Sequence, residues 1–322
     1  MDLASARGRA AHERRLSARL SDVEESRSDR RLRLLRRSAR GAAQGGNCDD
    51  AADSGPRERP EEDHPAVIIR DVLAPNPGPF TLSGTRTYLL GRSAVLDPGP
   101  AIDSHVEAIR AAMPNLKTIL ITHRHGDHAP AAVPLKHATG ARMIAPPGVL
   151  DDEQVDQRVR GGERLDIDGE TLEVIATPGH TSEHVCYLTS DGDLFTGDTI
   201  LGEGTTAIFP PDGNMADYLH SLRTLRSRNP RRIFPAHGPT RDDAVALIDH
   251  YIAHRLEREQ QIVTALDAGA HTVSSMRQRI YPELDKRLQG AAEVQIVAHL
   301  IKLESEGRVD ARGGAYFLTP VV

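Results

Sequence analysis

The chain has 322 residues, of which 39% are hydrophobic, and a formal net charge of -6. This length suffices for one large domain with a smaller one, and no apolar run approaches the roughly 20 residues of a membrane-spanning helix. The modest negative charge gives no support for binding to nucleic acid by bulk attraction.

Residues 1–62 are predicted to form a disordered extension. They contain few large apolar residues and no aromatic residue, so they cannot bury enough surface to offset chain entropy. They also lack the apolar segment of a secretory signal. A mitochondrial presequence and a start assigned too far upstream are alternatives, although acidic residues such as Glu13 argue against the presequence. The two cysteines, Cys48 and Cys186, are too few for a disulfide framework and indicate a reducing, cytoplasmic compartment.

Residues 63–240 contain short strand-like runs separated by turns rich in Pro and Gly, with helix-patterned segments between them. Apolar periodicity predicts helices over residues 103–113 and 215–226. Strands are predicted over residues 67–72, 85–90, 94–96, 118–122, 141–145, 171–176, 184–188, 194–196 and 232–234. This mixture predicts an α/β domain.

Residues 241–322 have a different character. Helical patterns cover residues 242–265, 273–280 and 292–306. The segments 307–309 and 313–318 then resemble the two strands of a small hairpin. Helices closed by a hairpin predict a winged-helix-like C-terminal domain.

The strongest functional signal is the run from Thr122 to His128, which places three imidazoles and a carboxylate directly after a predicted strand. A strand would keep His123 and His125 on one face, and the following turn would bring Asp127 and His128 to a neighbouring point. Imidazole and carboxylate are ligands that suit Zn²⁺, and they are also compatible with Mn²⁺ or Fe²⁺. The run therefore predicts two adjacent metal ions.

Further donors follow three later strands. His180 comes after a Pro-Gly turn, Asp198 follows Gly197, and His237 follows the strand over residues 232–234. Asp198 alone among these three can bridge two cations, because a carboxylate has two oxygens. Each motif is weak by itself, but their order behind the first histidine cluster favours a joint metal site.

The order of these motifs resembles that of the metallo-β-lactamase-fold hydrolase superfamily, over about Ala66 to Pro239. The resemblance implies a four-layer αββα sandwich. It also implies that Asp97, in an early Asp-x-Gly motif, orients the ligand loop. By the same resemblance the first metal would be held by His123, His125 and His180, the second by Asp127, His128 and His237, and Asp198 would bridge them.

Within the superfamily, residues 197–206 and the helical tail are similar to the β-lactamase-like protein 2 group. Members of that group include RNA-cleaving hydrolases, and related fungal proteins are thioesterases for polyketides bound to an acyl carrier. This chain has Arg86 where relatives usually have Asn between two threonines. We expect Arg86 to alter a substrate contact or a loop near the site.

Together these features predict a binuclear metal-dependent hydrolase that uses a metal-bridging hydroxide, oriented by the catalytic residue Asp127. The predicted cofactors are two Zn²⁺ ions, and the predicted substrate is a small-molecule ester, an acyl thioester or a phosphodiester. Two alternatives are a single-stranded RNA endonuclease of the β-lactamase-like protein 2 type and a thioesterase resembling hydroxyacylglutathione hydrolase. The sequence assigns no oligomeric state.

The RNA alternative depends on a basic face around the predicted hairpin. The affinity of such a face for RNA would fall as the salt concentration increases. The simpler interpretation is that these charges solvate the helices and that the tail caps the groove or mediates dimerisation. The residues concerned are Arg277, Arg279, Lys286, Arg287, Lys302, Arg308 and Arg312.

Overall fold

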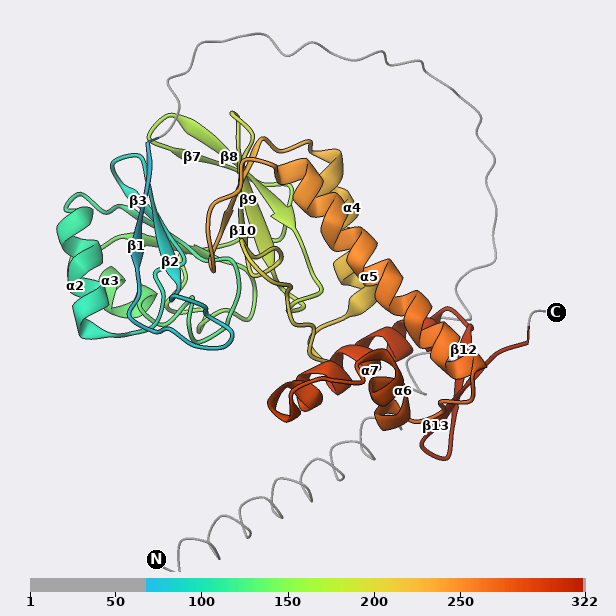
Figure 1. Ribbon diagram of the computed structural model, residues 1–322. Coiled ribbons are helices and arrows are strands. Elements are labelled where there is room, and N and C mark those ends of the chain that lie inside the picture. Colours follow the sequence, from blue (N-terminus) through green and yellow to red (C-terminus); the bar gives the residue numbers. More distant parts are fainter. Residues whose placement is uncertain (1–67, 321–322) are drawn as a thin grey trace, which may run out of the picture. The chain divides into compact units, whose positions relative to one another are not determined.

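Two β-sheets face each other in the computed structural model, which describes residues 68–320 (Figure 1). The predicted extension over residues 1–62 lies outside the described residues. In the first sheet the pairs β1–β2 and β2–β3, which lie at one edge, are antiparallel, and the other neighbouring strands are parallel. Its strands, in spatial order, are β1 (Ile69–Leu73), β2 (Arg86–Leu90), β3 (Ala94–Leu96), β4 (Thr118–Leu120), β5 (Arg142–Ala145) and β6 (Gln157–Arg158).

The second sheet has five strands, and only its β10–β11 pair is parallel. In spatial order these strands are β11 (Arg232–Pro235), β10 (Asp193–Gly197), β9 (Val185–Thr189), β8 (Glu170–Ala176) and β7 (Arg164–Ile167). Alternate residues of each strand point to opposite faces, so each sheet contributes one apolar face to the space between the sheets and one to a helical layer.

Four layers result from this alternation. Tyr88 and Leu90 of β2 pack between the sheets against Phe195, whereas Leu89 faces outward. Helices α2 (Asp103–Ala112) and α3 (Ala132–Thr139) cover the outer face of the first sheet. Helices α4 (Met215–Ser227) and α5 (Ala244–Asp267) cover that of the second. The predicted αββα sandwich is confirmed.

The C-terminal part consists of α6 (Val273–Ile280), the short 3₁₀ helix η1 (Lys286–Leu288), α7 (Gln289–Ser305) and the hairpin of β12 (Val309–Arg312) with β13 (Ala315–Leu318). Helix α6 begins with a capping box in which Thr272 and Ser275 bond each other's backbone. This arrangement confirms the winged-helix-like prediction. No helix among residues 68–320 is long and apolar enough to cross a bilayer.

Helix α5 contributes to two cores. Ile248 and Tyr251 in its first half pack on the second sheet, whereas Ile262 and Leu266 in its second half pack with α6, α7 and the hairpin. The boundary that we predicted between residues 240 and 241 therefore precedes a helix shared by both parts, and it stays a proposal.

Four elements were absent from the predictions, namely α3, β6, β7 and η1. Helix α3 contains Pro134, which usually argues against a helix but is tolerated here because the first turn has no partners for its N–H groups. Strand β7 alternates Arg164 and Asp166 with two apolar residues, and only the apolar pair is buried. An edge strand with one exposed face gives too short an apolar pattern to recognise.

A buried carboxylate joins α5 to the C-terminal elements. Glu259 is 6% exposed and accepts hydrogen bonds from Lys302 Nζ and Arg308 Nη1, each at 2.6 Å. Burial raises the pKa of Glu259, but His299, Lys302 and Arg308 together outweigh burial and lower it from 4.5 to about 2. Because the folded pKa is depressed, the stabilisation is present above the unfolded value and is lost as the pH falls towards 2.

We expect Glu259→Gln to lower the free energy of unfolding by about 2 kcal/mol at pH 7, since it leaves the Lys302 ammonium without its buried partner. The difference between variant and wild type should shrink as the pH falls from about 4.5 to about 2. Urea denaturation at several pH values measures this difference. A constant difference across that range would show that the charge of Glu259 contributes nothing.

Candidate metal centre

The histidine cluster lies on a loop rather than on a strand. Strand β4 ends at Leu120, and the segment from Thr122 to His128 follows it without strand pairing. The expectation that strand periodicity places His123 and His125 on one face was therefore wrong. The backbone N–H of Thr122 donates instead to Asp97 Oδ1 at 2.8 Å, which turns the chain away from the sheet.

Asp97 anchors this loop. It is fully buried after β3, and its Oδ2 accepts hydrogen bonds from Thr122 Oγ1 at 2.7 Å and lies 2.9 Å from His128 Nδ1. With Nδ1 paired to the carboxylate, the Nε2 of His128 points towards the other imidazoles. These contacts are the ones expected of a residue that orients the ligand loop.

Two glycines bring the later donors into place. Gly179, with φ of 137°, approaches α4 so closely that a Cβ would lie 2.4 Å from the Cα of Tyr218. Gly197, with φ of 48°, would place a Cβ 2.6 Å from Thr122 Oγ1. Each glycine immediately precedes a predicted donor, and a side chain at either position would push the donor's loop outward.

The first group of donor atoms comes from three histidines and Asp198. The Nδ1 of His125 lies 3.0 Å from His123 Nε2 and 3.1 Å from His180 Nε2. Asp198 Oδ2 lies 3.5 Å from His180 Nε2 and 3.9 Å from His123 Nε2. All four donors lie within 4.8 Å of one another, so they could hold one metal ion.

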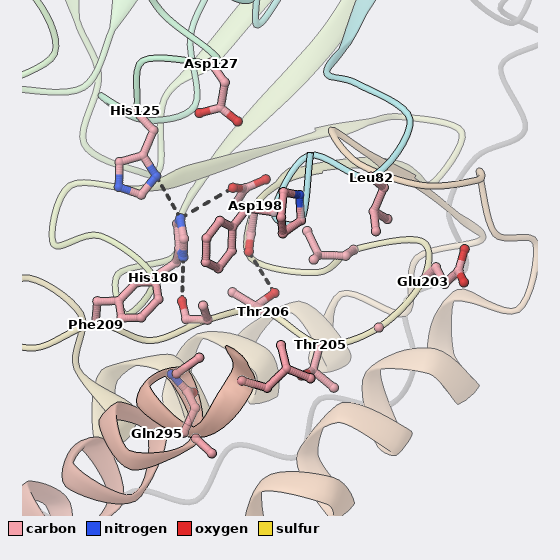
Figure 2. A pocket seen from close by; sticks show the side chains of 18 of the residues that line it. Leu82, His125, Asp127, His180, Asp198, Glu203, Thr205, Thr206, Phe209 and Gln295 are labelled. Carbon is pink, nitrogen blue, oxygen red and sulfur yellow. Dashed lines mark hydrogen bonds and ion pairs between the residues drawn. The ribbon is translucent and has the colours of Figure 1, made fainter. Parts of the chain in front are cut away.

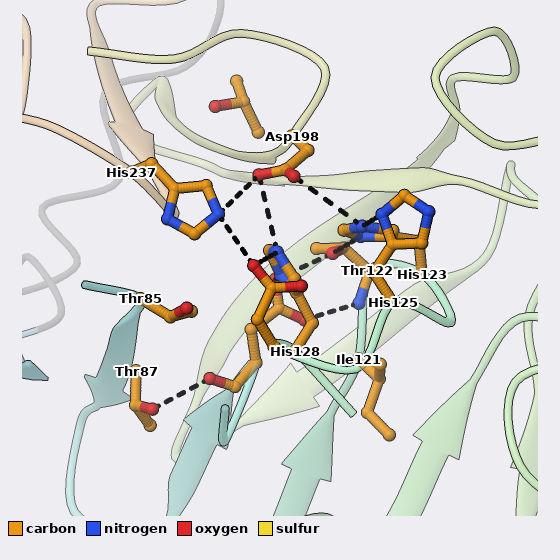
Figure 3. A network of polar contacts seen from close by, with 12 residues as sticks. Thr85, Thr87, Ile121, Thr122, His123, His125, His128, Asp198 and His237 are labelled. Carbon is orange, nitrogen blue, oxygen red and sulfur yellow. Dashed lines mark hydrogen bonds and ion pairs between the residues drawn. The ribbon is translucent and has the colours of Figure 1, made fainter. Parts of the chain in front are cut away.

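The second group contains Asp127, His128, His237 and again Asp198. His237 Nε2 lies 3.2 Å from both Asp127 Oδ2 and Asp198 Oδ1. His128 Nε2 lies 3.6 Å from Asp127 Oδ2 and 3.4 Å from Asp198 Oδ1. Asp198 thus directs Oδ2 to the first group and Oδ1 to the second, and Figure 3 shows it between His237 and the first histidines.

Three donor atoms of the second group are buried without a hydrogen-bond partner, namely His128 Nε2, His237 Nε2 and Asp198 Oδ1. Buried polar atoms are nearly always satisfied in folded proteins, because leaving one unpaired is costly. A divalent cation between these atoms would satisfy all three. The donor set therefore fits a metal at this position, and all seven predicted side chains lie in one of the two groups.

The electrostatics of the cluster are tightly coupled. Burial and the neighbouring imidazoles hold the pKa of His123 well below its usual value. Burial also opposes a charge on His128, but Asp198 and Asp97 outweigh burial and raise its pKa well above the usual value. Burial favours the neutral form of Asp198, yet the surrounding histidines lower its pKa and keep it ionised.

Contacts to the backbone orient two more imidazoles. His180 Nδ1 lies 2.9 Å from the carbonyl oxygen of Ala207, and His237 Nδ1 lies 3.4 Å from that of Gly84. A ring nitrogen that donates to a carbonyl leaves the other nitrogen free to bind a cation. Both His180 and His237 therefore present Nε2 to the cluster.

His184 belongs to this site but was absent from our predictions. Its ring is buried and stacks on that of His123, with centroids 4.8 Å apart, and its Nε2 accepts a hydrogen bond from the backbone N–H of Asp198 at 3.3 Å. Its Nδ1 lies 2.9 Å from Thr177 Oγ1. His184 fixes the start of the Asp198 loop, and no motif around it signals that role.

Arg86 contacts a loop near the site, which is one of the two roles that we expected for it. Its Nε donates to the carbonyl oxygen of Gly238 at 2.8 Å, and its Nη1 pairs with Asp71 at 2.5 Å. Arg86 therefore ties β2 to the segment that carries His237. Arg86 does not line the cavity that opens onto the donor groups.

A cavity of about 610 Å³ opens onto both donor groups. His125, Asp127, His180 and Asp198 lie on its lining, so the cluster is reachable from solvent (Figure 2). A volume of this size accommodates a small-molecule substrate. Cys186 lies in the core rather than at this cavity, since its thiol is buried and burial raises its pKa to about 12.

Residues 81–237 match the metallo-beta-lactamase superfamily, and residues 272–315 match the beta-lactamase associated winged helix domain. A beta-lactamase-like protein 2 homolog from Caenorhabditis elegans is 35% identical over 257 residues, which cover 75% of this chain and 86% of the relative. An atrochrysone carboxyl ACP thioesterase from Cryptosporiopsis sp. (strain 8999) is 31% identical over 220 residues, or 66% of each protein.

Among solved structures, the crystal structure of a metallo-beta-lactamase family protein from Thermus thermophilus has a TM-score of 0.63 at 22% identity. The match covers 78% of this chain and 98% of that protein, and it shows likeness of fold. The chain therefore belongs to the metallo-beta-lactamase superfamily, carries its associated winged helix domain and is similar to beta-lactamase-like protein 2 homologs.

Proposed function

We propose that this chain is a binuclear metal-dependent hydrolase that cleaves ester or thioester bonds. The observation that carries the proposal is the orientation of Asp198, whose two oxygens face two separate groups of donors. Imidazole and carboxylate donors suit Zn²⁺, and Mn²⁺ or Fe²⁺ accept the same ligands. We assign His123, His125 and His180 to one ion and Asp127, His128 and His237 to the other, with Asp198 between them.

Divalent cations supply, when bound, a water that is acidic near neutral pH and a Lewis acid for the substrate oxygen. Asp127 has a side chain that is 26% exposed and lies on the cavity lining, so it can contact that water. Its carboxylate orients the water and accepts a proton as the water oxygen bonds to the acyl carbon. The bond from carbon to the leaving sulfur or oxygen then breaks, and the leaving group takes up the proton.

The open cavity favours catalysis over a structural metal site. Structural zinc is normally enclosed by protein ligands, whereas catalytic zinc keeps a position for water or substrate. Here four of the seven donor residues line a solvent-accessible cavity. The name of the fungal relative, an acyl-carrier thioesterase, supports a thioester as the substrate. We place the activity in the cytoplasm, as the cysteine content suggests.

The basic face required for RNA binding is largely neutralised within the described part of the chain. Five of its seven side chains lie in ion pairs, so their charges are already partnered. Arg308, for example, pairs with Glu259 at 2.6 Å, and Arg277 pairs with Glu293 at 2.8 Å. This pairing reduces the net positive charge that the face offers to phosphates, which weighs against the RNA alternative.

Metal analysis and a hydrolysis panel test the proposal. We expect about two transition-metal equivalents per chain, and chelation should abolish hydrolysis of thioesters while readdition of Zn²⁺ restores it. Asp127→Asn should lower kcat by about 10² to 10⁴-fold, because a neutral amide cannot accept the proton. The matched control Asp267→Asn removes an exposed carboxylate at the end of α5 and should leave kcat unchanged. Full activity of the chelated protein would contradict the proposal.

A further inference from the structure

The cavity above the donor groups has an apolar wall that the proposed chemistry does not use. Phe80, Phe209 and Leu288 line it, and their exposed fractions are 64%, 38% and 54%. The described residues include only seven large hydrophobic side chains with such exposure, and three of the seven gather here. Clusters of exposed apolar side chains usually mark a binding surface.

The two phenylalanines form a pair at the rim of this wall. Their rings meet edge to face, with centroids 6.2 Å apart and an interplanar angle of 78°. Phe80 comes from the segment before β2, whereas Phe209 follows the loop that carries Asp198. Figure 2 shows Phe209 on the same side of the cavity as His180. An apolar group seated against this pair would therefore lie beside the first donor group.

The C-terminal part supplies much of this apolar wall, from Leu284 and Leu288 to Ala291, Ala292 and Gln295. Gln295 fixes α7 to the segment that ends at Phe209. Its Nε2 donates to the carbonyl oxygen of Ile208 at 3.0 Å, and its Oε1 accepts from the N–H of Ile208 at 3.3 Å. The helix thus holds a defined position along the cavity.

The charge of the lining separates substrate classes. No Lys or Arg lines the cavity in the described part of the chain, and its charged lining residues besides histidine are Asp127, Asp198 and Glu203. Beyond the donor groups, a polyanionic RNA backbone would meet Glu203 and uncharged side chains but no Lys or Arg. An uncharged apolar chain loses water against the same surface at no electrostatic cost.

We infer that this wall is an acyl-binding site that selects substrates with an extended apolar acyl group, such as medium-chain or aryl thioesters. The inference rests on the proposed function and adds its substrate class. The acyl chain lies between the Phe80–Phe209 pair and the surface of Leu288 and Ala292, with its carbonyl carbon towards Asp127. The winged helix domain accordingly forms one side of the substrate site.

Thioesters of N-acetylcysteamine with acetyl, hexanoyl and decanoyl groups test this site. Burial of one methylene favours binding by up to about fourfold. We expect kcat/KM for hexanoyl to exceed that for acetyl by at least about tenfold, since part of that gain is lost to ordering the chain. Leu288→Gln should reduce this ratio about threefold or more, and Ala292→Phe should lower kcat/KM for decanoyl most strongly.

The control variant is Leu256→Gln, which alters an apolar side chain that is 41% exposed on α5 and lies outside the cavity lining. It should keep the wild-type ratio of hexanoyl to acetyl. Equal kcat/KM for all three acyl groups in the wild type, or equal ratios in all variants, would overturn the acyl-binding site while leaving the hydrolase intact.

Calorimetric binding separates this inference from the proposed function. The S-decyl thioether of N-acetylcysteamine cannot be hydrolysed, and we expect it to bind at least about tenfold more tightly than the S-methyl thioether. Leu288→Gln should weaken the binding of the decyl compound. Tight decyl binding without thioester hydrolysis would support the site and contradict the proposed function. Equal binding of the two thioethers would overturn the site. The same holds if the decyl compound binds weakly and a short single-stranded RNA displaces it.

Discussion

Asp198→Ala is expected to lower kcat/KM for thioester hydrolysis by at least about 10³-fold and to reduce the metal content from about two equivalents to less than one. Asp198 is the single residue shared by both donor groups, with Oδ2 facing one group and Oδ1 the other. Its loss removes one donor from each proposed metal position. It also removes the carboxylate oxygen that lies 3.4 Å from His128 Nε2 and 3.2 Å from His237 Nε2.

Metal content after dialysis and steady-state kinetics measure this effect. Glu203→Ala serves as the comparison, because Glu203 carries a carboxylate on the same loop but belongs to neither donor group. That variant should keep about two metal equivalents. Two tightly bound equivalents in Asp198→Ala would show that the carboxylate does not bridge metal ions.

Asp97→Ala should lower the free energy of unfolding by about 3 to 5 kcal/mol and weaken metal binding by about 10- to 100-fold. Asp97 is fully buried and accepts hydrogen bonds from both the N–H and the hydroxyl of Thr122. It also pairs with His128 Nδ1 at 2.9 Å. Without this carboxylate, the loop between Thr122 and His128 loses the contacts that hold it.

Asp168 provides a matched control for Asp97. It also has a positive φ and accepts hydrogen bonds from a backbone N–H, that of Arg92, and from a hydroxyl, that of Ser93. It is exposed and lies outside both donor groups. Asp168→Ala should cost only about 1 kcal/mol of stability and leave metal affinity unchanged. Urea denaturation of the metal-free proteins and competition with a chelator measure both quantities. Equal effects of the two substitutions would contradict the special role of Asp97.

Local sequence patterns predicted most of the secondary structure because each pattern reflects an element's own burial. Strand β3 and helix α6 have the predicted bounds, and helix α4 differs by a single residue. The predictions were wrong where tertiary contacts override the pattern. Strand β4 stops at Leu120 because Asp97, rather than a neighbouring strand, binds the N–H of Thr122.

The candidate ligands were recognisable from the sequence because histidine and aspartate at strand ends have few other reasons to occur in that order. His184 had no such signal. It follows no turn motif, and it acts through stacking on His123 and a bond to the backbone of Asp198. A residue that acts by orienting another residue can be identified only when the position of that second residue is known.

The sequence by itself predicted the candidate donors and the change to helical patterns after residue 240, because ligand chemistry and apolar periodicity are properties of short segments. The sandwich was implied by the resemblance of the motif order to a known superfamily. Only the tertiary structure decided that the two oxygens of Asp198 face different groups of donors. It also decided that Phe80, Phe209 and Leu288 line the same cavity as Asp198. These residues come from segments that are up to about two hundred positions apart in the chain. Contacts between such distant segments depend on how the sheets and helices pack, and packing is a property of the whole chain.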